Sequence, residues 1–129
     1  MRSESQIQYD IRCFLYARGW FSLNMMGNAF QKGVPDLYCI HLQHGKRWIE
    51  VKRPDHYDFT KWQLIVFPQL EAHGDQIFVL VNNSMEEYEK LWEEPNWRTY
   101  LKPRHLKRME KLRHLDTATW LVSTMGAAR

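Results

Sequence analysis

The chain has 129 residues, of which 44% are hydrophobic and 26% are charged. This length allows one domain with a substantial core but not two domains with separate cores, and the composition is typical of a globular chain rather than of extended disorder. The longest apolar stretches are much shorter than the roughly 20 residues that a membrane span requires, so we expect no association with a membrane.

The first residues and the cysteines indicate the cellular compartment. The stretch MRSESQIQYD contains neither an apolar segment nor a small-residue cleavage site, so nothing marks the chain for secretion and we expect a cytoplasmic protein. Cys13 and Cys39 are far apart, and each lies in an apolar segment. This arrangement favours two reduced, buried thiols over a disulfide.

Charge is distributed unevenly along the chain. Residues 1–94 carry 10 Lys/Arg and 13 Asp/Glu, a net charge of −3, whereas residues 95–129 carry 8 and 2, a net charge of +6. A basic tail on a mildly acidic body favours a polyanionic partner, with nucleic acid as the first candidate, although a solvated basic helix face is the alternative. We therefore divide the chain into a core, residues 1–94, and a basic, helical C-terminal extension, residues 95–129, packed on the same domain.

Hydrophobic periodicity and turn residues predict the secondary structure. The expected elements are a helix over residues 3–20, strands over 21–26, 35–42 and 47–53, a helix over 60–74, a strand over 76–81, a short acidic helix over 84–94 and a basic helix over about 103–114. Ser3 with Gln6 matches a capping box, and Thr60 is a second helix cap. Pro68 predicts a kink or break near Phe67. The order predicts an α/β fold with a mixed sheet flanked by helices.

Three charged residues occupy positions where a packed hairpin over residues 35–53 would favour apolar ones. They are Asp36, at the start of one strand, and Glu50 and Lys52, inside the next. Because strand side chains alternate between faces, Glu50 and Lys52 share one face. An odd-length connection near residues 41–45 would place Asp36 opposite Glu50, whereas a slip of one residue would separate them.

Two carboxylates on one face repel each other unless a cation lies between them. Oxygen ligands of this kind suit Mg²⁺ or Mn²⁺, which bind one or two carboxylates and keep several waters. Lys52 beside such an ion could orient an attacking water or stabilise a phosphoryl transition state. The alternative is an edge hairpin whose acids face water and whose lysine opposes aggregation.

The surrounding residues resemble the PD-(D/E)XK nuclease superfamily and, within it, the virus-type replication-repair nuclease (VRR-NUC) domain. The matching features, in the family's order, are Glu4 opening the first helix, Gly19 and Trp20 closing it, GVPDL at 33–37, IEVKRP at 49–54 and Gln63 on a helix. The resemblance covers about residues 4–81. It implies a restriction-endonuclease-like core and a metal-dependent DNA endonuclease. The family's stand-alone viral members are homodimers that act on branched DNA, which for this chain would mean the host cytoplasm.

The resemblance also implies a role for each matching residue. The implied catalytic residues are Glu4, Asp36, Glu50, Lys52 and Gln63. Asp36, Glu50 and the backbone carbonyl of Val51 would bind Mg²⁺ or Mn²⁺, and Glu4 is a further candidate ligand. Lys52 would be the catalytic lysine, and Gln63 would contact the scissile strand or that lysine. The tail after about residue 95 has no counterpart in the family, so its role is predicted from charge alone.

Further DNA contacts are predicted from charge and position. Lys32 lies on a loop beside the proposed site, and Arg53 follows the catalytic motif. In the basic helix, an apolar stripe of Leu106, Met109 and Leu112 would leave the basic side chains facing phosphate or solvent. These side chains are Arg104, Lys107, Arg108 and Lys111.

Two further readings remain open. Trp62 and Tyr88, at helical spacing with aliphatic residues, are expected in the core rather than at a base-stacking surface. The alternative to an enzyme is a catalytically silent nuclease-fold module that binds DNA in replication or repair.

Overall fold

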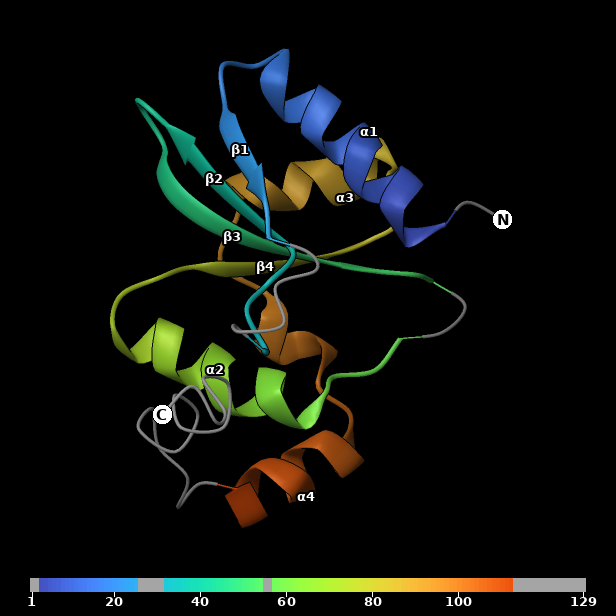
Figure 1. Cartoon of the computed structure of the whole chain (residues 1–129), viewed down its shortest axis with the longest axis vertical. Helices are drawn as coiled ribbons and strands as arrows, with labels where there is room; N and C mark the ends of the chain where they lie inside the picture. The colour runs from blue at the N-terminus through green and yellow to red at the C-terminus, as the bar shows by residue number, and fades with distance from the viewer. Residues whose placement is uncertain (1–2, 26–31, 55–56, 113–129) are drawn as a thin grey trace, which may run out of the picture.

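In a computed structural model, which describes residues 3–25, 32–54 and 57–112, a four-stranded sheet separates two layers of helices (Figure 1). The elements in chain order are α1 (Glu4–Tyr16), β1 (Phe21–Asn24), β2 (Leu37–His41), β3 (Gly45–Lys52), α2 (Lys61–Ala72), β4 (Ile77–Val81), α3 (Met85–Glu89), two short 3-10 helices, η1 (Lys90–Trp92) and η2 (Trp97–Tyr100), and α4 (Pro103–Leu112). The predicted order of helices and strands is confirmed. The chain is therefore α/β, with a mixed sheet and flanking helices.

The sheet is built from three antiparallel strands and one crossover. Its strand order is β1-β2-β3-β4, in which β2 is antiparallel to both β1 and β3, and β4 is parallel to β3. A parallel pair needs a crossover connection, and α2 supplies it. Four of the five residues of β4 are buried, because helices cover this part of the sheet on both faces (Figure 1).

The two predicted helix caps are confirmed. Ser3 accepts a hydrogen bond from the Gln6 backbone while the Gln6 side chain accepts one from the Ser3 backbone, and Thr60 and Gln63 repeat this arrangement at α2. Pro68 predicted a kink or a break near Phe67, and a break there is wrong, because α2 continues through that position. Residues 64–67, directly before Pro68, are buried and pack the helix into the core, which offsets the missing backbone hydrogen bond.

Two apolar clusters cover the two faces of the sheet. The cluster under α1 and α3 includes Leu37, Cys39, Ile49 and Val51, which alternate with Glu50 and Lys52 along the hairpin. The cluster under α2 includes Phe59, Leu64, Phe67, Ile77, Val79 and Trp97.

Both cysteines are free, but Cys13 is exposed and only Cys39 is buried. The predicted burial of Cys13 is wrong because α1 turns other side chains toward the sheet.

Helix α4 packs against the second cluster through a different stripe from the one predicted. Met109 and Leu112 contact the cluster and His105 is buried, whereas Leu106 is 53% exposed. Spacing of four and then three residues keeps His105, Met109 and Leu112 on one face, so the predicted position of Leu106 is wrong. Residues 113–129 of the predicted extension lie outside the described residues. Among the helices of the described ranges, none is long and apolar enough to cross a membrane.

Candidate functional site

The register of the β2–β3 hairpin places Asp36 opposite Glu50. His41 pairs with Gly45, which leaves the three-residue turn 42–44, and the same register continued to the other end of the hairpin pairs Asp36 with Glu50. Gly45 closes the turn with φ of +78°, a conformation that residues with a side chain rarely adopt. Of the two registers that the sequence left open, the structure therefore has the odd-length connection and not the slip of one residue.

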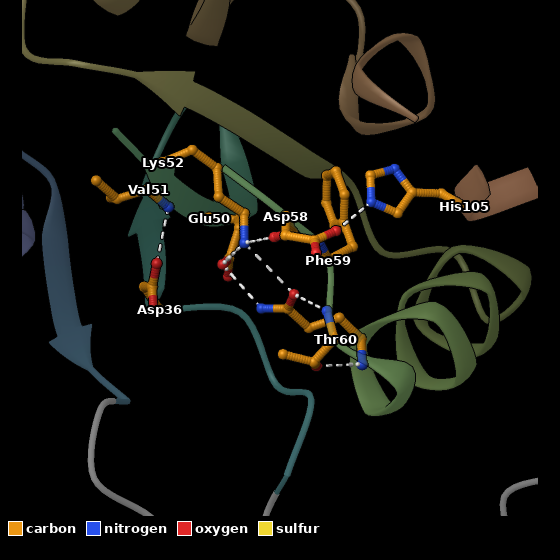
Figure 2. A network of polar contacts seen from close by, with 9 residues as sticks. Asp36, Glu50, Val51, Lys52, Asp58, Phe59, Thr60 and His105 are labelled. Carbon is orange, nitrogen blue, oxygen red and sulfur yellow. Dashed lines mark hydrogen bonds and ion pairs between the residues drawn. The ribbon is translucent and has the colours of Figure 1, made fainter. Parts of the chain in front are cut away.

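Asp36 is fixed by the neighbouring strand. Its Oδ2 atom accepts a hydrogen bond from the backbone N–H of Val51 at 2.8 Å (Figure 2). In an extended strand the N–H and C=O of one residue point to the same side, so the Val51 carbonyl faces the same edge as the Asp36 carboxylate. The Val51 carbonyl oxygen and the Asp36 carboxylate thus lie on the same side of β3, next to the first residue of β2.

Glu50 is a buried carboxylate with only one of its oxygens satisfied. The residue is 2% exposed, and its Oε2 atom contacts Lys52 Nζ at 2.9 Å and accepts a hydrogen bond from Gln63 Nε2 at 2.9 Å (Figure 2). Its Oε1 atom is buried and has no hydrogen-bond partner in the described part of the chain. A buried charged oxygen without a partner costs free energy, so this position favours a cation or a proton.

Acidic groups outnumber cations at this site. Burial raises the pKa of Asp36 to about 8, and repulsion from Glu50 adds to the rise. Burial also raises the pKa of Glu50, against the opposing effect of Lys52. Glu4, which is exposed at the start of α1, raises the pKa of both acids further. Three acids and one lysine leave the site short of positive charge.

The oxygen atoms of this site suit a hard divalent cation. Asp36 and Glu50 could bind Mg²⁺ or Mn²⁺ together with the Val51 carbonyl, and water would complete the coordination. The unpartnered Glu50 oxygen and the raised pKa of both acids fit such an ion. Across residues 3–25, 32–54 and 57–112, no group of three or more His, Cys, Asp or Glu side chains is gathered closely enough to hold a metal ion. A metal here would therefore rely on two carboxylates.

Lys52 is held by acceptors from three segments of the chain. Its Nζ atom lies 2.7 Å from the Asp58 carbonyl oxygen, 2.9 Å from Glu50 Oε2 and 3.4 Å from Gln63 Oε1. The Phe59 ring lies against the ammonium group, with 4.8 Å from Nζ to the ring centre. The structure thus brings Lys52 and Gln63 to the two acids, although Gln63 also caps α2.

Sequence reasoning missed two polar residues near this site and one buried polar residue on α1. Asp58 and His105 are hydrogen-bonded to each other (Figure 2), although they are 47 residues apart. No local pattern signals such a contact. Gln8 lies one helical turn after Glu4 and is buried, with neither atom of its amide partnered in the described ranges. Its spacing from Glu4 was the available signal.

The predicted DNA contacts fall in two places. Lys32 lies next to Trp62, with 6.0 Å from Nζ to the ring centre, and Lys61 lies 5.2 Å from the same ring. Trp62 is half-buried and belongs to neither core cluster, so the prediction that it lies in the core is wrong, whereas Tyr88 is buried as expected. Gly33 packs so tightly here that a Cβ atom would lie 2.4 Å from the Trp62 carbonyl oxygen.

The remaining predicted contacts lie at the end of β3 and on α4. Arg53 is half-buried directly after β3, and Arg104 contacts the Asp58 carboxylate at 3.4 Å. The side chains of Lys107, Arg108 and Lys111 are exposed. These three lysine and arginine residues form what we call the basic face of α4.

Comparisons with known proteins leave the function to be argued from this geometry. The sequence matches no protein-family model and no curated protein, and the structure matches no solved structure. The resemblance to PD-(D/E)XK nucleases therefore rests on the quoted motifs alone. What any function must explain is a half-buried aspartate and a buried glutamate beside a fixed lysine.

Proposed function

We propose that this chain is a divalent-metal-dependent DNA endonuclease with a core of the PD-(D/E)XK, VRR-NUC-like type. The observation that carries the proposal is Glu50, a buried carboxylate with one oxygen bound to Lys52 and Gln63 and the other without a partner. A purely structural glutamate would be expected to satisfy both oxygens. A site of this kind is suited to an ion and a phosphodiester.

Each polar residue of the site would have a separate task. Asp36, Glu50 and the Val51 carbonyl would hold Mg²⁺ or Mn²⁺, which would supply Lewis acidity to a phosphoryl oxygen and to water. The 3.4 Å contact from Lys52 to Gln63 is the longest of the three lysine contacts, so it is the one that a phosphoryl oxygen or an attacking water would replace. Lys52 would then stabilise the charge that develops on the scissile phosphate.

The DNA would approach across cations next to this acidic site. Lys32 and Lys61 flank Trp62, and Trp62 directly precedes Gln63, which contacts Glu50. Ammonium groups can bind phosphates while an aromatic ring stacks on an unpaired base. This combination supports a preference for branched DNA, such as flaps or four-way junctions, in which bases near the cleavage point are unpaired. The basic face of α4 would add backbone contacts.

A homodimer would give two such sites for the two strands of a branched substrate. Phe21 and Ile40 are paired across β1 and β2, and both are exposed, at 58% and 38%. Leu23 is exposed on the same edge strand. An apolar surface at a sheet edge supports self-association, and sedimentation of wild type against Phe21→Lys tests it. A monomer at all concentrations would remove the dimer from the proposal.

The decisive experiment is a cleavage assay with purified protein, Mg²⁺ or Mn²⁺, and a panel of linear, flapped and four-way DNA. Wild type should cleave a branched substrate, and chelation of the metal should stop it. Asp36→Ala and Glu50→Ala should each abolish cleavage. The matched control is Glu89→Ala, which removes an exposed acid on α3, remote from the acids in the sequence, and should leave the rate unchanged.

Two outcomes would reject the proposal. One is the absence of cleavage of every DNA in the panel, and the other is cleavage that Asp36→Ala and Glu50→Ala do not reduce. Calorimetry with Mn²⁺ separates the enzyme from a silent DNA-binding module. Loss of Mn²⁺ binding in Glu50→Ala supports the enzyme, whereas equal weak binding by both proteins together with DNA binding supports the module.

A further inference from the structure

The position of the Lys52 ammonium group depends on a segment that follows β3. Lysine has a long, flexible side chain, so its ammonium group stays in one place only if its acceptors are fixed. The shortest contact, 2.7 Å, is to the backbone carbonyl of Asp58. That carbonyl belongs to the segment 57–60 that leads into α2, so whatever fixes the segment also fixes the lysine.

Helix α4 fixes this segment from the other side. The Asp58 carboxylate is 58% exposed, yet its Oδ1 atom accepts hydrogen bonds from the Phe59 backbone N–H at 2.8 Å and from the His105 ring. The Phe59 ring contacts both His105 and Lys52. It is nearly perpendicular to the His105 ring, with ring centres 5.2 Å apart, and the Lys52 ammonium group lies over its face. Segment 57–60 thus touches the lysine through one side and α4 through the other.

His105 is built to make this contact in one orientation. It is 2% exposed, and its Nδ1 atom accepts the backbone N–H of Lys102 at 2.9 Å. With Nδ1 acting as acceptor, the ring proton lies on Nε2, which donates to Asp58. Capping the start of α4 needs only Nδ1. The second contact, across to Asp58, has no use in the helix itself, and it defines the distance between α4 and the segment that holds Lys52.

We propose that His105 is a positioning residue for Lys52, acting through Asp58, so that the basic C-terminal helix forms part of the reaction site rather than only a DNA tether. This inference rests on the proposed nuclease function. The link runs from the His105 ring to the Asp58 carboxylate, and from the Asp58 carbonyl to the Lys52 ammonium (Figure 2). Its loss would let the ammonium group move away from Glu50 without removing any group that binds DNA or metal.

The test compares His105→Ala, His105→Gln and Asp58→Ala with wild type on the branched DNA that wild type cleaves fastest. His105→Ala should lower the single-turnover rate at saturating DNA and Mn²⁺ by about 10- to 100-fold, the range expected for a misplaced catalytic group. The affinities for DNA and Mn²⁺ should stay within about twofold. His105→Gln, which keeps a donor and an acceptor, should recover most of the rate. Asp58→Ala changes an exposed side chain and leaves no cavity, so it should repeat the rate loss even if His105→Ala fails to fold.

Met109→Ala is the matched control. Met109 packs on the same cluster from the same helix, so its truncation lowers stability without touching Asp58. Its cleavage rate at saturating DNA should equal that of wild type at a temperature where it is folded. A rate loss as large as that of His105→Ala would assign the effect to general loosening of α4 and overturn the proposal.

A second measurement does not depend on cleavage. Acetic anhydride labelling of folded protein, followed by mass spectrometry of the Lys52 peptide, reports how well the ammonium group is held. Labelling of Lys52 should increase in Asp58→Ala and His105→Ala and stay at the wild-type level in Met109→Ala. Unchanged labelling would overturn the positioning role. Increased labelling in a protein that cleaves no DNA would keep the link and reject only the nuclease function.

Discussion

Asp36 and Asp58 belong to the same polar network around Lys52, but their environments are opposite. Asp36 is half-buried, accepts a hydrogen bond from one backbone N–H and lies opposite Glu50, and its pKa is raised to about 8, first by burial. The Asp58 carboxylate is exposed and receives His105, the Phe59 backbone and Arg104, and its pKa falls to about 2, first because of the His105 hydrogen bond. Asp36 lies opposite another acid, whereas Asp58 is surrounded by hydrogen-bond donors and one cation, Arg104. Asp36 is therefore suited to binding a cation, and Asp58 is suited to holding two segments of the chain together.

The largest contrast is expected in catalysis. Asp36→Asn keeps the size and the acceptor of the side chain but removes a charge that would bind the metal, so the single-turnover rate should fall by about 10³-fold or more. Asp58→Asn should lower the rate by only about tenfold, since it weakens a positioning contact. Rates measured at saturating DNA over a range of Mn²⁺ concentrations test this ordering. Equal losses in the two variants would remove the distinction drawn between the two acids.

Stability without metal should change in opposite directions. At pH 8 with chelator, Asp36→Asn relieves repulsion from Glu50 and the cost of burying a charge, so the free energy of unfolding should rise by roughly 2 kcal/mol. Asp58→Asn weakens the acceptor of a buried histidine N–H, so the free energy should fall by about 1 kcal/mol. Urea denaturation of both variants measures these values. A stability loss in Asp36→Asn would show that the acid is satisfied without a cation.

The stability differences of Asp36→Asn and Asp58→Asn from wild type should change over different ranges of pH. The pKa of Asp36 in the folded state, about 8, lies above its unfolded value near 4, so the folded state binds more protons and wild type loses stability as pH rises from about 4 to about 8. The pKa of Asp58, about 2, lies below its unfolded value, so its contribution is full above about pH 4 and is lost as pH falls toward about 2. Thermal melts of wild type and both variants from pH 2 to pH 9 should separate these windows. A variant whose difference from wild type does not vary with pH would contradict the assigned pKa shift.

The smallest effect concerns the two faces of α4. Replacement of Lys107, Arg108 and Lys111 by Gln should flatten the plot of log affinity against log salt by about 0.9 for each phosphate of duplex DNA that the helix no longer neutralises. Cleavage at saturating DNA should stay near the wild-type rate, in contrast to the His105 variants. Lys46→Gln, an exposed lysine on β3 near the hairpin turn, is the control. An unchanged salt slope in the triple variant would assign the basic face to something other than DNA.

Features set by local spacing could be predicted from the sequence. Period-two alternation placed Glu50 and Lys52 on the face opposite Val51, and it limited Asp36 to two registers, of which the structure has the one opposite Glu50. The Ser3 capping box and the Thr60 helix cap each depend on residues three apart, so the sequence predicted these caps as well. In each case the interacting residues are close in sequence or joined by one hairpin, which leaves few possible geometries.

Features set by tertiary packing could not be predicted. In a ten-residue helix such as α4, more than one set of residues at helical spacing could form the buried face. A histidine can take a buried position in place of leucine when both of its ring nitrogens have hydrogen-bond partners, as those of His105 do. Trp62 looked like a core residue because its neighbours are apolar, but it lies in the first turn of α2, before the buried stretch 64–67. The nuclease function, its metal and its substrate remain predictions that the experiments above test.

The hydrogen bond between His105 on α4 and Asp58 in segment 57–60 has a consequence for the synthesis of the protein. The acids and Lys52 leave the ribosome well before His105, which follows Asp58 by 47 residues. If His105 positions Lys52, a growing chain can fold its sheet and expose its acids to nucleic acid before the lysine is held in place. Under the proposed function, the nascent chain would then cleave nucleic acid more slowly until α4 has emerged and docked.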